Sequence, residues 1–155
     1  MDKRNIKTVF ALFLYAIAMA LVESAVVVYL RELYYPGGFF IQSVADLAVM
    51  SPRILNVELW REAATILMLA AVGYLAFNDF RKRVAAFFLA FSIWALAYYF
   101  FLYLFLRWPP SRTTFDFYFL IPWPWIGPAW FPLALFGLLT TGSLWFIIKS
   151  KNHES

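Results

Sequence analysis

Four charged residues stand inside long apolar stretches of this 155-residue chain. Glu23 interrupts the first stretch, and Glu58, Arg61 and Glu62 open the second. A charge within a membrane span costs free energy, so it usually faces other protein or a water-filled cavity and marks a candidate functional site. Carboxylates accept protons or bind cations, and a guanidinium binds carboxylate and carbonyl oxygens. These residues are therefore the first candidates for chemistry.

The second group of charges has helical spacing. Glu58, Arg61, Glu62 and Thr65 follow one another at intervals of three and four residues, which stacks them on one face of a helix. Glu58 and Glu62 lie one turn apart, close enough to bracket one cation or share one guanidinium. An ion pair between Arg61 and Glu23 would neutralise both charges between two helices.

Four apolar segments must position these side chains. Hydrophobic residues make up 64% of the chain and charged residues 14%, against roughly 45–50% and 25% in soluble domains. A membrane-spanning helix needs about 20 predominantly apolar residues, and the chain has such segments at about 8–30, 57–77, 84–106 and 127–148. We therefore expect an all-α polytopic membrane protein, a compact four-transmembrane-helix bundle forming a single integral membrane domain over residues 1–155.

The distribution of lysine and arginine predicts the orientation, because both are enriched in short cytoplasmic loops. The two termini and the second connection carry eight: Lys3, Arg4, Lys7, Arg81, Lys82, Arg83, Lys149 and Lys151. The first and third connections carry four: Arg31, Arg53, Arg107 and Arg112. We expect both termini in the cytoplasm and the protein in the plasma membrane. These charges form no extended stripe, so no nucleic-acid partner is expected.

Depth along the helices gathers the polar residues into one layer. At about 1.5 Å per residue, Glu23 lies roughly 10 Å below the outer surface, and Arg61 and Glu62 lie roughly 6–8 Å below it. Tyr98 and Tyr99 lie roughly 10–12 Å deep on the same side. The candidate site is therefore Glu23, Glu58, Arg61, Glu62, Tyr98 and Tyr99.

Three hypotheses for this site stay open. It is an interhelical ion-pair network that fixes packing, a ligand or substrate site that opens to the outside, or a carboxylate metal site or proton relay. The arginine between the two glutamates opposes binding of a cation. In a ligand site, Arg61 would hold an anionic or carbonyl group, one glutamate would accept a proton, and Tyr98 or Tyr99 would donate a hydrogen bond.

The third connection is rich in aromatic residues and prolines. Eight aromatic residues fall within residues 115–131, and the prolines among them prevent most of this segment from being helical. Tryptophan favours the membrane–water interface, so we expect the segment to cover the outer end of the bundle, with these tryptophans as interfacial residues: Trp108, Trp123, Trp125 and Trp130. Alternatively, it is a docking surface for a partner subunit or an aromatic wall for a lipid or quinone-like ligand.

Local patterns add three expectations. The first connection predicts a turn at residues 34–38, followed by a short amphipathic helix over residues 39–50. Pro128 is expected in the first turn of the last span and Pro132 at a slight kink. Small residues predict close helix packing on the first, third and fourth spans: Ala16, Ala20, Ser24, Ala86, Ala90, Ala134, Gly137, Thr141 and Gly142.

Several kinds of chemistry are excluded or improbable. The chain has no cysteine, and its only histidine, His153, lies in the polar tail. We therefore expect no metal and no cofactor, because haem and copper sites in membrane proteins usually need buried imidazoles. No phosphate-binding loop or hydrolase motif occurs. Enzymatic activity stays open.

The sequence favours an accessory or structural subunit of a larger membrane complex. The alternative is a membrane protein, with or without enzymatic activity, that binds a small molecule, lipid or quinone at an outward-facing Glu/Arg site. The expected partners are the lipid bilayer, protein subunits or further copies of the chain, and a lipid or quinone.

Overall fold

Four long helices and a short β-hairpin make up the described part of the chain, residues 3–150 of the computed structural model. Lys151 and His153 lie outside this range. The long helices are α1 (Lys3–Tyr34), α2 (Pro52–Ala76), α3 (Phe80–Leu106) and α4 (Trp130–Lys149). Each is long and apolar enough to cross a membrane, which confirms the predicted number of candidate spans. The mostly helical fold is also confirmed.

The helix boundaries follow from local capping. The Ser51 hydroxyl accepts a hydrogen bond from the Ile54 amide at 3.4 Å, and Pro52 occupies the start of α2, where its missing N–H costs little. The Asp79 carboxylate likewise accepts from the Lys82 amide at 2.9 Å and begins α3. Arg107 ends α3 with a left-handed backbone, at φ 53°. Because α2 ends at Ala76 and α3 begins at Phe80, the chain between these two helices is a tight turn.

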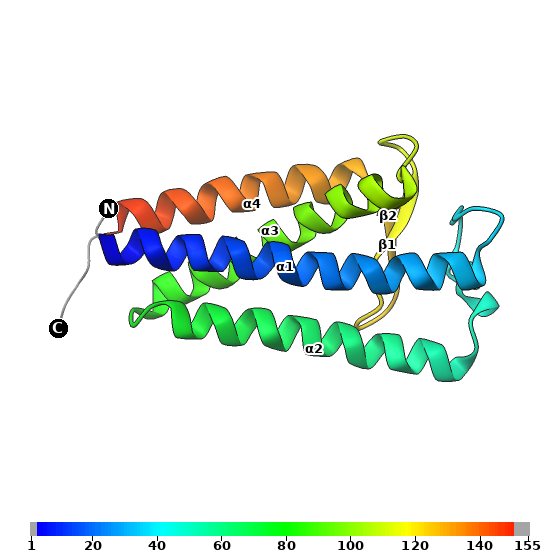
Figure 1. Ribbon diagram of the computed structural model, residues 1–155, viewed down its shortest axis with the longest axis horizontal. Coiled ribbons are helices and arrows are strands. Elements are labelled where there is room, and N and C mark those ends of the chain that lie inside the picture. Colours follow the sequence, from blue (N-terminus) through cyan, green and yellow to red (C-terminus); the bar gives the residue numbers. More distant parts are fainter. Residues whose placement is uncertain (1–2, 151–155) are drawn as a thin grey trace.

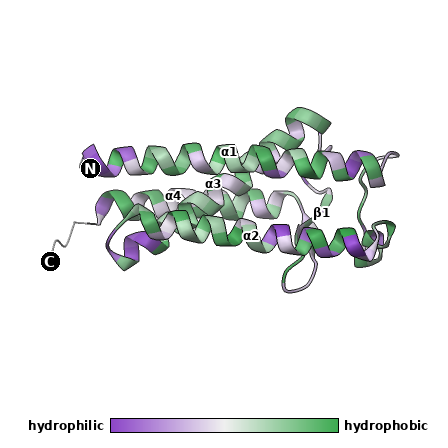
Figure 2. Ribbon diagram, turned by 60° about the horizontal axis from the view of Figure 1, so that its bottom comes forward, coloured by the Kyte–Doolittle hydropathy of each residue, from purple (hydrophilic) through white to green (hydrophobic). Residues whose placement is uncertain are grey.

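The central helix of the bundle is α3, which packs against each of the other three helices. In contrast, α1 and α2 make few contacts with each other. The two ends of α1 and α4 nearest the chain termini lie together at one end of the bundle, with the α2–α3 turn (Figure 1). The α1–α2 and α3–α4 connections lie at the opposite end, here called the loop end. Figure 2 shows apolar helix surfaces along most of the bundle, with a hydrophilic segment in α2 toward the loop end.

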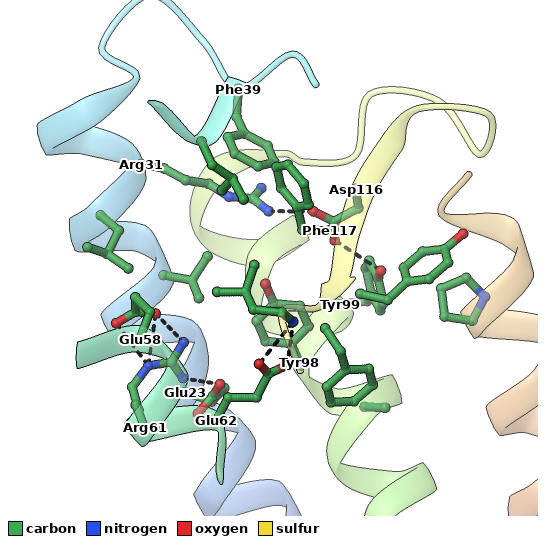
Figure 3. A pocket seen from close by; sticks show the side chains of 18 of the residues that line it. Glu23, Arg31, Phe39, Glu58, Arg61, Glu62, Tyr98, Tyr99, Asp116 and Phe117 are labelled. Atoms are coloured by element: carbon green, nitrogen blue, oxygen red, sulfur yellow. Dashed lines mark hydrogen bonds and ion pairs between the residues drawn. The ribbon is translucent and has the colours of Figure 1, made fainter. Parts of the chain in front are cut away.

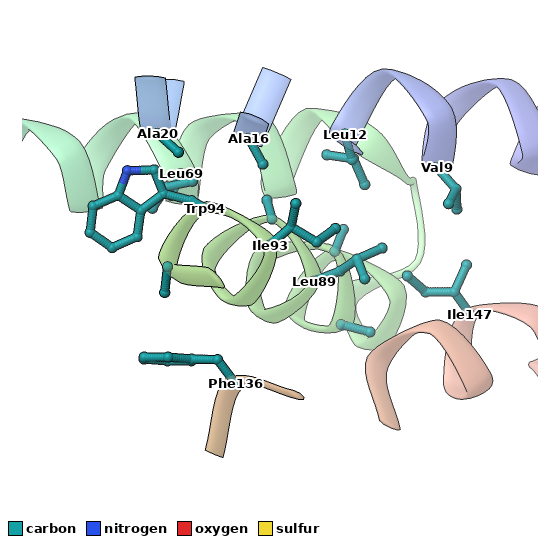
Figure 4. Close-up of a cluster of buried hydrophobic side chains, with 14 of the residues drawn as sticks. Val9, Leu12, Ala16, Ala20, Leu69, Leu89, Ile93, Trp94, Phe136 and Ile147 are labelled. Atoms are coloured by element: carbon teal, nitrogen blue, oxygen red, sulfur yellow. The ribbon is translucent and has the colours of Figure 1, made fainter. Parts of the chain in front are cut away.

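The apolar core runs along α3 (Figure 4). Ala16 and Ala20 of α1 and Ala86 and Ala90 of α3 are fully buried within it, as the small-residue patterns on these two helices predict. The absence of large side chains lets the backbones approach closely, which increases van der Waals contact. This packing explains why α1 and α3 form the most extensive helix pair.

The small-residue prediction for α4 is wrong. Ala134, Thr141 and Gly142 are exposed, and a Cβ placed on Gly137 would meet nothing within 4 Å. A different face of α4 packs on α3 and buries larger side chains, among them Phe136 and Ile147. The Thr140 hydroxyl also donates to the Ser92 hydroxyl at 2.8 Å. Because α4 packs extensively on α3 alone among the described helices, its bulky face makes this contact and the small face stays uncovered.

The fold is not purely α-helical, because the third connection contains a β-hairpin. Strands β1 (Phe115–Phe119) and β2 (Trp125–Pro128) pair antiparallel, with Phe115 opposite Pro128. Prolines prevent a helix here, as the sequence predicts. The alternating aromatic residues of β1 instead favour a strand, because their rings suit a pleated, half-buried surface.

Two other local expectations need correction. Residues 39–50 form no amphipathic α-helix: the only helical part is a 3-10 helix, η1 (Val44–Val49), because the Asp46 side chain accepts from the Gln42 and Ser43 amides and fixes a tight turn. Pro128 lies in β2, so α4 begins later and Pro132 falls in its first turn. A first-turn proline blocks no helical hydrogen bond, so it gives no reason for a kink.

Gly73 provides a test of the α2–α3 packing. A Cβ at Gly73 would lie 2.8 Å from both the Cα and the N of Phe87, whose backbone cannot move without shifting α3. Gly73→Ala is expected to destabilise the fold by about 1–3 kcal/mol, as overpacking does. Gly137→Ala, on the open face of α4, is the matched control and should be neutral or stabilising. Thermal unfolding of both variants in the same detergent measures the difference, and equal stability would contradict the close packing.

Candidate functional site

The first part of the site is an ion-pair cluster between α1 and α2. The Arg61 guanidinium donates to Glu58 one turn earlier on α2 and to Glu23 of α1, as the predicted pair requires. The distance from Arg61 Nε to Glu58 Oε2 is 3.0 Å. The Thr65 hydroxyl donates to the second Glu23 oxygen at 3.3 Å. Helical spacing puts all three α2 side chains on the face that meets Glu23, so the cluster joins two helices that otherwise touch little.

Glu62 does not share the guanidinium with Glu58. Its two carboxylate oxygens accept from the backbone amide of Leu120, at 2.9 and 3.0 Å, directly after strand β1. A buried backbone N–H needs an acceptor, and no strand partner is present at this position of the hairpin. Glu62 therefore joins α2 to the hairpin, a role that its spacing from Glu58 does not reveal.

A second buried ion pair lies nearer the loop end. Arg31 of α1 donates to Asp116 of β1 at 3.2 Å, and the Tyr99 hydroxyl donates to the other Asp116 oxygen at 3.0 Å. The Arg31 guanidinium carbon lies 3.9 Å from the ring centroids of both Phe39 and Trp108. Cation–π contacts of this kind strengthen when they are shielded from water. Burial raises the pKa of Asp116 to about 6, although the charge of Arg31 and the Tyr99 hydroxyl act in the opposite direction.

The two clusters line one cavity of about 140 Å³, which Figure 3 shows at close range. All six predicted site residues contribute to its wall: Glu23, Glu58, Arg61, Glu62, Tyr98 and Tyr99. The rest of the wall is mainly apolar and aromatic and comes from α1, α3, the hairpin, the first connection and the start of α4. The side chain of Arg61 is 24% exposed and that of Glu23 is 12% exposed, so the ion-pair cluster between α1 and α2 is partly accessible from outside.

Polar atoms around the cavity are not equally satisfied. The Arg61 Nε, Nη1 and Nη2 atoms all donate to Glu23 or Glu58. In contrast, Nε and Nη1 of Arg31 and the indole nitrogens of Trp94 and Trp108 are buried and have no hydrogen-bond partner among the described residues. Of these three residues, Arg31 and Trp94 line the cavity. Most buried polar groups in proteins have a partner, so exceptions often mark a binding site. The donors that remain for a ligand thus come from Arg31 and Trp94, whereas the sequence singled out Arg61.

Sequence reasoning treated Arg31 only as a loop charge and passed over Asp116 and Trp94. One signal for Arg31 was present, because it follows Ser24 by seven residues and so continues the packed face of Ala16, Ala20 and Ser24. Asp116 carried no comparable signal, since its burial depends on hairpin pairing and on a contact 85 residues away.

The predicted interfacial tryptophans fall into two groups. Trp108 is buried, stacks on Tyr99 at a centroid distance of 6.3 Å and packs against Arg31. Trp123, Trp125 and Trp130 are exposed around the hairpin, and the first two stack on each other. Trp108 therefore belongs to the support of the site, and the other three form an exposed aromatic surface.

No family model, curated protein or solved structure matches this chain. The chemistry of the site therefore has to be judged from its own residues. Among residues 3–150, the cavity wall includes no serine, threonine or histidine, and its carboxylates are engaged by arginine, tyrosine, threonine or backbone donors. Such an arrangement suits non-covalent binding better than nucleophilic catalysis.

Proposed function

We propose that this chain is an integral membrane protein that binds a small amphipathic molecule in the cavity at its loop end. The observation that carries this proposal is the combination of a mainly apolar cavity with buried donors that lack partners. Binding sites are typically apolar concave spaces with a few polar groups that fix the orientation of the ligand. A structural ion-pair network needs no cavity beside it.

The ion pairs and the cavity have different roles in this proposal. Arg61, Glu23 and Glu58 neutralise one another and hold α2 against α1. Arg31 and Asp116 hold the hairpin over the cavity. The ligand then occupies the space between these two fixed clusters, so the packing hypothesis and the ligand hypothesis apply to different atoms of the same site.

The proposed orientation places the cavity at the external side of the plasma membrane. Both termini and the α2–α3 turn share one end of the bundle, and most lysines and arginines outside the cavity lie there. Cytoplasmic loops carry such an excess. The loop end, with the exposed tryptophans, would then meet the outer interface.

Cysteine labelling tests this orientation, because the chain has no cysteine of its own. Asn78→Cys lies in the α2–α3 turn and Thr113→Cys lies before the hairpin, both at exposed positions. A membrane-impermeant maleimide applied to intact cells should label Thr113→Cys, and should label Asn78→Cys only after permeabilisation. The reverse pattern would overturn the proposed orientation.

A cavity-filling variant tests the proposed binding. Ala95 lies on α3, is buried and lines the cavity, so Ala95→Leu should occupy part of it. We expect small molecules that co-purify with the full chain in mild detergent to be depleted at least about tenfold in this variant, as judged by mass spectrometry of organic extracts. The matched control is Ala134→Leu on the exposed face of α4, which should retain them.

Unfolding of Ala95→Leu must be measured beside the extraction. If the variant keeps native stability and carries the same molecules in the same amount as the wild type, then the cavity is not the binding site.

The exposed aromatic surface favours a second candidate function, a subunit of a larger membrane complex. Trp123, Trp125 and Trp130 are each about half exposed or more and surround a shallow hollow in the hairpin region. Tryptophan is enriched where proteins bind one another. Under this proposal, native purification should yield a second polypeptide in constant ratio, and replacing Trp123 and Trp125 by Ser should release it. A monodisperse chain that elutes alone in both cases would contradict it.

A further inference from the structure

Around the cavity, the carboxylate acceptors have hydrogen-bond partners, whereas several donors do not. Every oxygen of the four carboxylates in its wall already accepts a hydrogen bond: Glu23, Glu58, Glu62 and Asp116. The unpartnered atoms are donors, Nε and Nη1 of Arg31 and Nε1 of Trp94. The Tyr98 hydroxyl also lines the cavity and makes no hydrogen bond within the described residues. A ligand would therefore complete this site by supplying acceptor atoms.

The charges of the wall limit what kind of acceptor fits. Four acidic side chains face two basic ones, Arg31 and Arg61, so the ionised wall carries an excess of negative charge. An anionic head group would add a further negative charge in a low-dielectric site, which is unfavourable. A cationic head group would be attracted by this charge, but it would leave the unpartnered donors of Arg31 and Trp94 without acceptors. An uncharged group with acceptor oxygens avoids both penalties.

The volume and the walls limit the size and shape of that group. A cavity of about 140 Å³ is close to the engineered cavity of about 150 Å³ that binds one benzene molecule in another protein. Whole drug-sized ligands need roughly 300–1,000 Å³. Trp94 and Tyr98, stacked at a centroid distance of 6.3 Å, provide an aromatic wall. A single flat group therefore fits inside, and a longer chain has to extend beyond the cavity.

We propose that the ligand is a neutral amphiphile whose ring-sized head group carries carbonyl or other acceptor oxygens and whose apolar tail extends beyond the cavity. The inference rests on the proposed binding function and adds the chemical class of the ligand. Arg31, Trp94 and Tyr98 bind the oxygens. Two classes of molecule have an uncharged compact head group on an alkyl or isoprenoid tail. They are quinones, with a ring head group, and glycerides, with an ester head group.

Four probes with the same ten-carbon tail test this class. They are a decyl-substituted benzoquinone, 1-monodecanoylglycerol, decanoate and decyltrimethylammonium. Equilibrium binding of each radiolabelled probe to the full chain in lipid nanodiscs is measured, and uptake by empty nanodiscs is subtracted. The two neutral probes should bind at least about tenfold more tightly than the charged ones. Tighter binding of the benzoquinone identifies a ring head group, and tighter binding of the glyceride identifies an ester.

Donor-deletion variants connect the binding to the named residues. Tyr98→Phe and Trp94→Phe each remove one donor and keep an aromatic side chain, so each should weaken the neutral probe roughly three- to tenfold. The matched controls, Tyr103→Phe on α3 and Trp145→Phe on α4, lie at exposed positions and should leave binding unchanged.

The outcomes separate this inference from the proposed function. Tighter binding of decanoate or of the ammonium probe, abolished by Ala95→Leu, would overturn the neutral head group and leave cavity binding intact. Equal weakening by the control variants would contradict the assignment of Tyr98 and Trp94 as hydrogen-bond donors to the ligand. Binding of every probe to Ala95→Leu as tightly as to the wild type would contradict both proposals.

Discussion

The buried contact between Arg31 and Asp116 is the interaction on which the loop end depends. It joins the end of α1 to a hairpin that follows α3, across 85 positions of the sequence. Tyr99 holds the second Asp116 oxygen, and Phe39 and Trp108 cover the two faces of the guanidinium. Removing either charge would leave the other buried without its partner, which costs far more than the pair contributes over apolar packing. The first connection, the hairpin and α3 thus share one common anchor.

The bundle has two halves that are held by different forces. Toward the chain termini, Leu12, Ala16, Leu89 and Ile147 pack in an apolar core around α3. Toward the loop end, α1 and α2 make few direct contacts, and the Arg61 ion pairs join them. Directional contacts between polar side chains keep helices at defined positions without filling the space between them. The cavity of the loop end lies beside these charged residues.

The sequence predicts the helices well because they depend on local properties. Apolar runs of sufficient length are visible without any tertiary information, although α2 and α3 begin before the predicted 57 and 84, directly after the caps Ser51 and Asp79. The helical spacing of Glu58, Arg61 and Thr65 likewise reveals which side chains meet Glu23. Tyr98 and Tyr99 line the same cavity as these residues, which agrees with counting along helices of constant rise per residue.

Residues in the connections could not be placed in this way. The burial of Asp116 and Trp108 depends on hairpin pairing and on the packing of Phe39, none of which has a periodic signal. The small-residue face of α4 resembled that of α1 in sequence. Which of these faces is buried against another helix depends on the tertiary arrangement of the helices. The assignment of ligand donors failed similarly: Arg61 and Arg31 are equally basic, and only the number of carboxylates near each one distinguishes them.

The contact between Glu62 and the Leu120 amide has a consequence for how the site tolerates change. The carboxylate binds the main chain and does not contact a particular side chain at position 120. The contact itself therefore places no requirement on the side chain at position 120, with proline as the exception because it lacks the N–H, although the Leu120 side chain also lines the cavity. The glutamate itself has no such freedom. The donor of this contact is a backbone N–H, so a comparison of side chains between related sequences would reveal only the glutamate. The contact is nevertheless as fixed in space as an ion pair.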